Sequence, residues 1–188
     1  FTPTDGITGN AEISVNPSRF TDAAGNANDA ASNTITIAVD TEEPTISIAS
    51  DVSALKVGET ATLTITLSEA STDFAQGDLT VSGGTITAFS GSGTSYTATF
   101  TPTDDITGNA EISVNTSKFT DAAGNANNAA SNTVTIAVDT AEPTISIASN
   151  VSELKVGEQA TLTITLNEAS TDFDENDISV SGGTIGGF

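Results

Sequence analysis

The feature that most constrains this chain is an internal repeat of 99 residues. When the 188-residue sequence is compared with itself at that offset, Phe1 pairs with Phe100 and Phe89 pairs with Phe188, and only 17 of the 89 paired positions differ. Identity at this level indicates tandem duplication. The folding unit is therefore about 99 residues long, and any feature assigned to one copy is expected again in the next.

The repeat divides the chain into one complete module and two incomplete ones. A polar Asp-Thr-x-Glu-Pro connector precedes each new copy. We predict the tail of a preceding module at residues 1–40, a complete module at 41–139 and the head of a following module at 140–188. Half a module cannot bury a core by itself, so either the chain is a window on a longer array or neighbouring chains complete the halves. We favour a segment of a longer array, because the tail module of one chain joined to the head module of another would still lack the equivalent of residues 90–99.

Alternation of apolar and polar residues predicts the secondary structure. In residues 61–68, Leu63, Ile65 and Leu67 alternate with three threonines, which is typical of a strand with one buried face. Seven short segments of this kind, and no helical periodicity, predict an all-β antiparallel Ig-like β-sandwich. A Gly/Ser loop is predicted at residues 90–94. The predicted strands are 45–50, 61–68, 79–81, 86–89, 96–100, 110–114 and 134–138.

Composition excludes several classes of function. The chain has no Cys, His, Met or Trp, which removes disulfides, thiolate chemistry, histidine acid–base catalysis and most zinc sites. With 25 acidic and four basic residues its net charge is −21, so nucleic acid and anionic membranes would repel it. No segment reaches the roughly 20 apolar residues of a membrane helix. We expect no nucleic-acid partner, no membrane insertion and no enzymatic activity.

The order of the sequence motifs resembles a known family. The segments PTISI, LKVGETATLTITLSEA, DLTVSGGTI, YTATFTPTD, FTDAAGNA and TIAVDT follow one another, and they are similar to the bacterial Ig-like repeats of very large surface adhesins. The resemblance covers the whole chain. It implies a long extender stalk, a secreted or bacterial cell-surface location, and calcium binding. It also implies calcium positions at the connector Asp and at the Asp-x-x-Gly-Asn loop, here Asp121–Asn125 and Asp22–Asn26.

The acidic residues are predicted to gather at the module ends. Successive strands of such a sandwich run from pole to pole, so the loops 68–78 and 121–131 share one end with the connector 40–43. By this assignment 11 of the 12 carboxylates between residues 40 and 138 lie at the ends, and only Glu111 lies in a strand. Clustered carboxylates repel by about 1 kcal/mol per pair at 4 Å even in water. Ca²⁺, which takes six to eight oxygen ligands, would remove that repulsion.

These placements predict calcium sites at the joints between modules. The alternative for Asp121 and Asn125 is that they only cap a turn, with Gly124 supplying a positive φ. Acidic positions that change between copies, such as Glu42, rank lower as ligands. The predicted ligands are Asp40, Glu69, Asp78 and Asp121, then Asp73 and Asn125, at the entry of the complete module; Asp139, Glu168, Asp172 and Asp177 at the next joint; and Asp22 at the previous one.

Two functions are compatible with this pattern. The first is a structural extender of a repetitive cell-surface adhesin or fibre, with joints stiffened by calcium, neighbouring repeats as partners, and lateral or head-to-tail copies in a fibre. The second is a ligand-binding array for carbohydrate or ice, motivated by outward rows such as Thr62, Thr64 and Thr66. The second lacks exposed aromatic residues for stacking sugars, since Tyr96 alternates with core positions. The first is therefore preferred.

Overall fold

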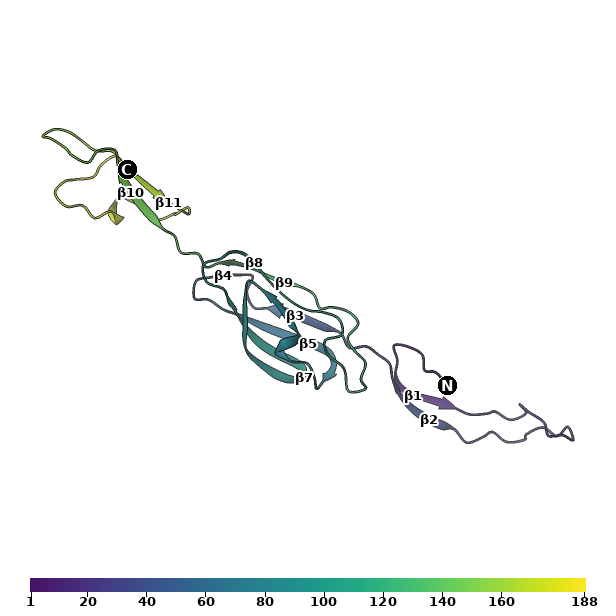
Figure 1. Cartoon of the computed structure of the whole chain (residues 1–188). Coiled ribbons are helices and arrows are strands. Elements are labelled where there is room, and N and C mark those ends of the chain that lie inside the picture. The colour runs from purple at the N-terminus through teal and green to yellow at the C-terminus, as the bar shows by residue number, and fades with distance from the viewer. The chain divides into compact units, whose positions relative to one another are not determined.

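The complete module forms seven strands in two sheets, and six of these strands contain the alternating segments (Figure 1). The computed structural model describes residues 1–188, which divide into two units, Phe1–Thr140 and Ala141–Phe188. One sheet of the complete module has the order β3 (Ile46–Ser50), β5 (Ala61–Ser71), β7 (Gly84–Pro102). The other has the order β4 (Ala54–Lys56), β9 (Val134–Asp139), β8 (Thr107–Val114), β6 (Leu79–Ser82), and a 3₁₀ turn, η1 (Gln76–Asp78), precedes β6.

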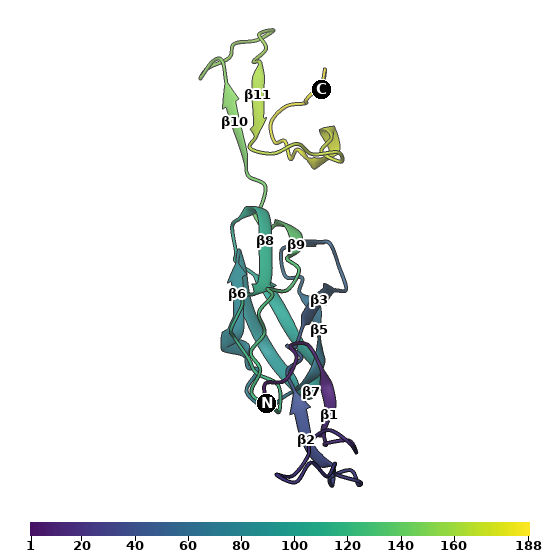
Figure 2. The same ribbon diagram turned by 90° about the vertical axis from the view of Figure 1, so that its right-hand side faces the viewer.

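The core lies between these two sheets, which Figure 2 shows from the side. Alternate residues of β5 point inward, and Leu63 and Ile65 are completely buried, whereas the threonines between them are exposed. From the opposite sheet, Ile112 and Ile136 are equally buried. Inward aliphatic residues thus supply the core, while outward threonines keep a high β-propensity on the wet face. The predicted all-β Ig-like sandwich is confirmed.

Strand β7 is folded back on itself. A straight strand would separate Gly84 from Thr101 by roughly 55 Å, at about 3.3 Å per residue. Instead, a Cβ atom on Gly84 would overlap the Thr101 carbonyl oxygen and the Phe100 ring, and Ser90 Oγ lies 3.1 Å from Thr97 Oγ1. The chain therefore reverses direction at the Gly/Ser segment that was predicted to be a loop. The reversal uses positive φ angles at Gly91 (131°) and Gly93 (65°), both within the bounds of β7.

Two other details differ from the prediction. Residues 54–56, which have no clear alternation, form β4 and pair in parallel with Ala137–Asp139 of β9. Strand β5 extends to Ser71, so Glu69 lies in a strand and the assignment of its segment to a loop was wrong. The register between β5 and β7 shifts after Thr66, and such an irregularity re-aims the side chains that follow it. A local shift of this kind leaves no mark on an alternating sequence.

The incomplete copies form isolated strand pairs. In the first unit β1 (Thr8–Ile13) pairs with β2 (Ile35–Asp40). In the second unit β10 (Ile145–Ser149) pairs with β11 (Leu162–Leu166), and η2 (Glu175–Asp177) follows. Most residues that are buried in the complete module are open in these copies, and Val39 is an exception. Phe20 is 61% exposed, whereas its equivalent Phe119 is 1% exposed. The repeat therefore supplies matched pairs of identical residues in buried and open surroundings.

Candidate metal centre

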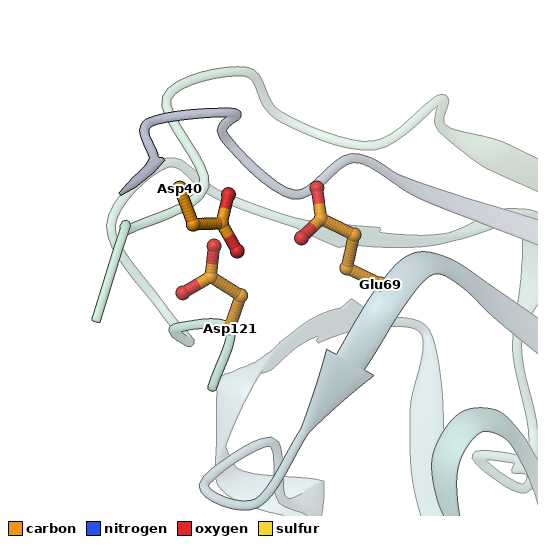
Figure 3. Close-up of side chains that lie close together, drawn as sticks. All are labelled: Asp40, Glu69 and Asp121. Atoms are coloured by element: carbon orange, nitrogen blue, oxygen red, sulfur yellow. The ribbon is translucent and has the colours of Figure 1, made fainter. Parts of the chain in front are cut away.

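Three carboxylates converge where the chain enters the complete module. Asp40 ends β2, Glu69 lies near the end of β5, and Asp121 follows the short bridge between Thr120 and Ala126. One carboxylate oxygen from each acid lies within 4.8 Å of the other two, and Figure 3 shows the three groups pointing toward one another. Asp121 is buried and the other two are half-buried. We call these three residues the acidic triad.

The loop of residues 121–125 holds the Asp121 carboxylate in a fixed orientation. Its Oδ1 accepts hydrogen bonds from the backbone N–H groups of Ala123, Gly124 and Asn125 at 2.7–2.8 Å. Its Oδ2 accepts one from Asn125 Nδ2 at 2.8 Å. Burial alone would raise the pKa of Asp121, but these donors together hold that pKa below its ordinary value. Asp121 therefore does cap the turn, with Gly124 at φ 96°, and it stays ionised beside two other acids.

Asp40 is held from both sides of the connector. In the strand pair that precedes the complete module, Thr8 Oγ1 donates to Asp40 Oδ1 at 2.9 Å. From the complete module, Asn125 Nδ2 donates to the main-chain oxygen of Asp40 at 3.2 Å. Asn125 thus lies beside the triad, with its amide nitrogen directed at both Asp40 and Asp121. These contacts explain why a connector Asp, remote in sequence, meets the other two acids.

Glu69 is the least satisfied member of the triad. Its Oε1 is buried and has no hydrogen-bond partner. Burial raises the pKa of Glu69, and the charges of Asp40, Asp121 and Glu42 raise it further. A buried, unpaired carboxylate oxygen surrounded by negative charge is unfavourable unless a proton or a cation compensates it. This oxygen makes the triad a candidate cation site.

We expect acidification to stabilise the metal-free protein over a limited window. The raised pKa of Glu69 means that the folded state binds its proton more tightly than the unfolded chain, so stability should rise as pH falls from 7 toward about 4.5. Asp73 and Asp121 have lowered pKa values, and their contribution should be lost only below about pH 3.8. Urea unfolding in a chelating buffer, repeated across the pH range, measures both changes in stability. Glu69→Gln should remove the rise in stability between pH 7 and about 4.5 and should leave the loss below about pH 3.8 unchanged. A rise that persists in Glu69→Gln would show that Glu69 is not its cause.

The remaining acids predicted for this end make other contacts. Asp73 accepts hydrogen bonds from the N–H and the Oγ1 of Thr120 at 2.9 and 2.8 Å, and the backbone donor is the main reason why its pKa is lowered. Asp78 accepts from the backbone N–H of Ala75 at 2.9 Å and so closes the turn η1. Both residues order loops near the triad, and neither is one of its three members.

The acids predicted for the other joints do not form a second such group. Asp22 repeats the hydrogen-bonded turn, and the side-chain donor of Asn26 is the main reason for its lowered pKa, but the residue is exposed. Asp139 accepts from Thr107 Oγ1 at 3.0 Å, as Asp40 does from Thr8. In the second unit the corresponding acids bond to nearby donors: Glu168 to Asn167, Asp172 to Ser170 and Asp177 to the backbone of Asp174.

Sequence reasoning missed the threonines that anchor the connector. Thr8 and Thr107 bind the connector Asp of their copies. Thr140 is buried, donates to the Thr103 carbonyl at 2.7 Å and accepts from the Ile106 N–H at 3.1 Å. The signal was available, because each threonine recurs at the same place in both copies. Threonine is so frequent in these strands that its recurrence did not stand out.

The fold and the acidic triad define an Ig-like β-sandwich module with an acidic group at its entry. The profile of the bacterial Ig-like domain family matches residues 40–138 and again residues 139–188, so the chain belongs to this family. Such domains are typically structural or extender modules without catalytic activity, outside the cell or exposed at its surface. A search of curated proteins finds no significant match. Neither short helix is long and apolar enough to cross a membrane.

Proposed function

We propose that this protein is an extender segment of a secreted bacterial surface adhesin, and that Ca²⁺ bound at the acidic triad stiffens the joint before the complete module. The observation that carries the proposal is the buried, unpartnered Oε1 of Glu69 beside the carboxylates of Asp40 and Asp121. Bound calcium would supply the positive charge that this arrangement lacks. The neighbouring repeats of the same chain are then the principal partners, and head-to-tail or lateral copies would build a fibre.

The donor set favours calcium over other metals. The triad offers only carboxylate oxygens, and the surrounding loop adds only amide and main-chain oxygens, which suit hard cations. Calcium accepts six to eight oxygens in flexible geometry, whereas magnesium demands a nearly ideal octahedron. Zinc and copper prefer nitrogen and sulfur ligands, and the chain has neither His nor Cys. Asp121 contributes one oriented carboxylate, because its Oδ1 already accepts three N–H donors.

The position of the triad explains how a cation would act on the joint. Asp40 belongs to β2, which pairs with β1 through six residue pairs. Glu69 and Asp121 belong to the complete module that follows. A cation shared by the three carboxylates therefore fastens the connector to the body of the module. Without the cation, repulsion among the same carboxylates favours separation of the connector from the loop.

We expect isothermal titration to detect calcium binding that depends on Glu69. Glu69→Gln keeps the shape of the side chain and removes one charge, and it should weaken binding at least about tenfold. The matched control is Glu168→Gln, the same change at the equivalent, half-buried position of the second unit, where no acidic triad forms; it should leave that affinity unchanged. Saturating calcium should also stabilise the module, by about 2.7 kcal/mol at 100 times the Kd. Equal affinity in wild type and Glu69→Gln would contradict the site.

Small-angle scattering tests the mechanical part of the proposal separately. With calcium, the conformational spread of the 188-residue chain should narrow and its mean maximum dimension should increase. A chelator should reverse the change, and Glu69→Gln should not show it. If calcium binds but the maximum dimension does not change, the calcium site stands and its role in stiffening the joint is rejected.

The alternative, a binding array for carbohydrate or ice, has less support. Threonines do lie in register across β5 and β7, where Thr62 and Thr64 oppose Thr99 and Thr97. A sandwich sheet twists by roughly 20–25° per strand, however, so such rows do not extend as a flat lattice. Tyr96 is buried, with its hydroxyl bonded to the Ser71 carbonyl at 3.2 Å, so it cannot stack on a sugar. Glycan-array and ice-recrystallisation assays would separate the two functions.

A further inference from the structure

Strand β3 lies at the edge of its sheet and is bonded to a strand on one side only. Its register pairs Ile46–Ser50 with Leu63–Leu67 of β5, and it has no other strand neighbour. The N–H and C=O groups on the outer side of an edge strand are a template for strand addition by another chain. Pro44, just before the strand, limits this at one end because it lacks an N–H group. The middle of the strand needs a different protection.

The side chain of Asn132 occupies the middle of this edge. Its Oδ1 accepts a hydrogen bond from the Ile48 N–H at 2.9 Å, and its Nδ2 donates to the Ile48 carbonyl at 2.8 Å. Ile48 is the central residue of β3. One carboxamide thus provides the same donor and acceptor that a residue of an added strand would provide. Asn132 lies just before β9, 84 residues further along the chain, so the bridge also ties the first strand of the module to its last.

We propose that Asn132 guards the edge of β3 against strand addition by a second copy of this chain. The hazard follows from the repeat, because the PTISIAS strand occurs twice in this chain, at residues 44–50 and 143–149, and an array holds such strands at high local concentration. Strands of identical sequence can pair in register, with their apolar residues on the same face. To add at β3, an incoming strand must first displace both hydrogen bonds of Asn132. The guard therefore keeps near-identical modules separate.

The chain contains a matched control for this residue. Asn33 is the equivalent of Asn132 in the first, incomplete copy. In the structure its side chain makes no hydrogen bond, whereas that of Asn132 makes both bonds to Ile48. Both side chains are exposed, so replacing either by alanine leaves no cavity in the core. Comparing the same substitution at the two positions therefore distinguishes the effect of losing the two hydrogen bonds to Ile48 from the effect of replacing an asparagine in this loop by alanine.

The first measurement is hydrogen exchange in Asn132→Ala, compared with wild type and Asn33→Ala. The Ile48 amide should exchange roughly tenfold faster or more in Asn132→Ala, because it loses its acceptor. The amide of Ile112, in the other sheet, should keep its protection. Asn33→Ala should match wild type at both amides. If Ile48 exchange is unchanged in Asn132→Ala, the bridge does not protect the edge and the proposal fails.

The second measurement is self-association, followed by analytical ultracentrifugation over a range of concentrations. The association constant of Asn132→Ala should exceed those of wild type and Asn33→Ala by about tenfold or more. Asn132→Asp, which keeps an acceptor for the Ile48 N–H and adds a charge at the edge, should associate no more than wild type. Faster Ile48 exchange without greater association would show that Asn132 only stabilises the module, and it would overturn the proposal. Unfolding of Asn132→Ala would also overturn it, because Asn132 would then be required for folding.

Discussion

Asn127→Ala should lower the unfolding free energy of the complete module by about 3–5 kcal/mol, because it leaves several buried backbone groups without partners. Asn127 is completely buried. Its Oδ1 accepts from the N–H groups of Lys118 and Phe119, and its Nδ2 donates to the carbonyls of Asn115 and Ala129. For a domain of this size the expected fall in Tm is roughly 15 °C or more. The fluorescence of Tyr96, the single tyrosine, reports this transition.

The control for that variant is Asn28→Ala. Asn28 makes the same four hydrogen bonds, to Arg19, Phe20, Asn16 and Ala30, but in the incomplete copy, where these groups are open to water. Water can replace the lost side chain there, so the transition reported by Tyr96 should not move. Equal shifts from the two variants would show that burial does not set the strength of this network.

Phe119→Ala should be about as damaging, through a cavity rather than through lost hydrogen bonds. Phe119 is 1% exposed and packs edge-on against Phe74, with ring centroids 5.4 Å apart. Removing a buried phenylalanine side chain typically lowers the unfolding free energy by about 3–5 kcal/mol. Because Phe119 lies two residues before Asp121, a loosened loop should also weaken calcium binding. Thermal unfolding and calcium titration of the same variant measure both effects.

Phe20→Ala removes the same side chain at the equivalent position of the first copy, where it is 61% exposed. No cavity forms there, so this variant should behave as wild type in both measurements. A loss of stability in Phe119→Ala without any loss of calcium affinity would show that the loop keeps its shape independently of the core beneath it.

The sequence predicted the sandwich because period-two alternation directly reflects which residues face the core. Leu63 and Ile65 were assigned inward for that reason, and both are completely buried. Alternation says nothing about irregular backbone. It therefore missed β4, whose three residues pair in parallel with β9, and the extension of β5 to Ser71, which places Glu69 in that strand.

The members of the acidic triad were predicted to lie together for a different reason. Pole-to-pole strand direction places Asp40, Glu69 and Asp121 at one end of the module whatever the loop details are, and the structure brings these three acids together. The same argument ranked Asp78 as highly, but that side chain closes the turn η1 instead. Which acid turns inward depends on local backbone donors, and these cannot be assigned before the loop conformation is known. The orphaned Oε1 of Glu69 likewise emerges only from packing.

The parallel pairing of β4 with β9 has a consequence for tension along the chain. In an array of such modules, tension would enter each module through its first strands and leave it through the end of β9. Because Ala54–Lys56 and Ala137–Asp139 run side by side in the same direction, such a pull slides the two strands past each other. Their hydrogen bonds are then loaded together in shear, instead of being peeled apart one at a time. A series of such modules would resist stretching most strongly at the pairing of β4 with β9, although β4 has no clear alternation in the sequence.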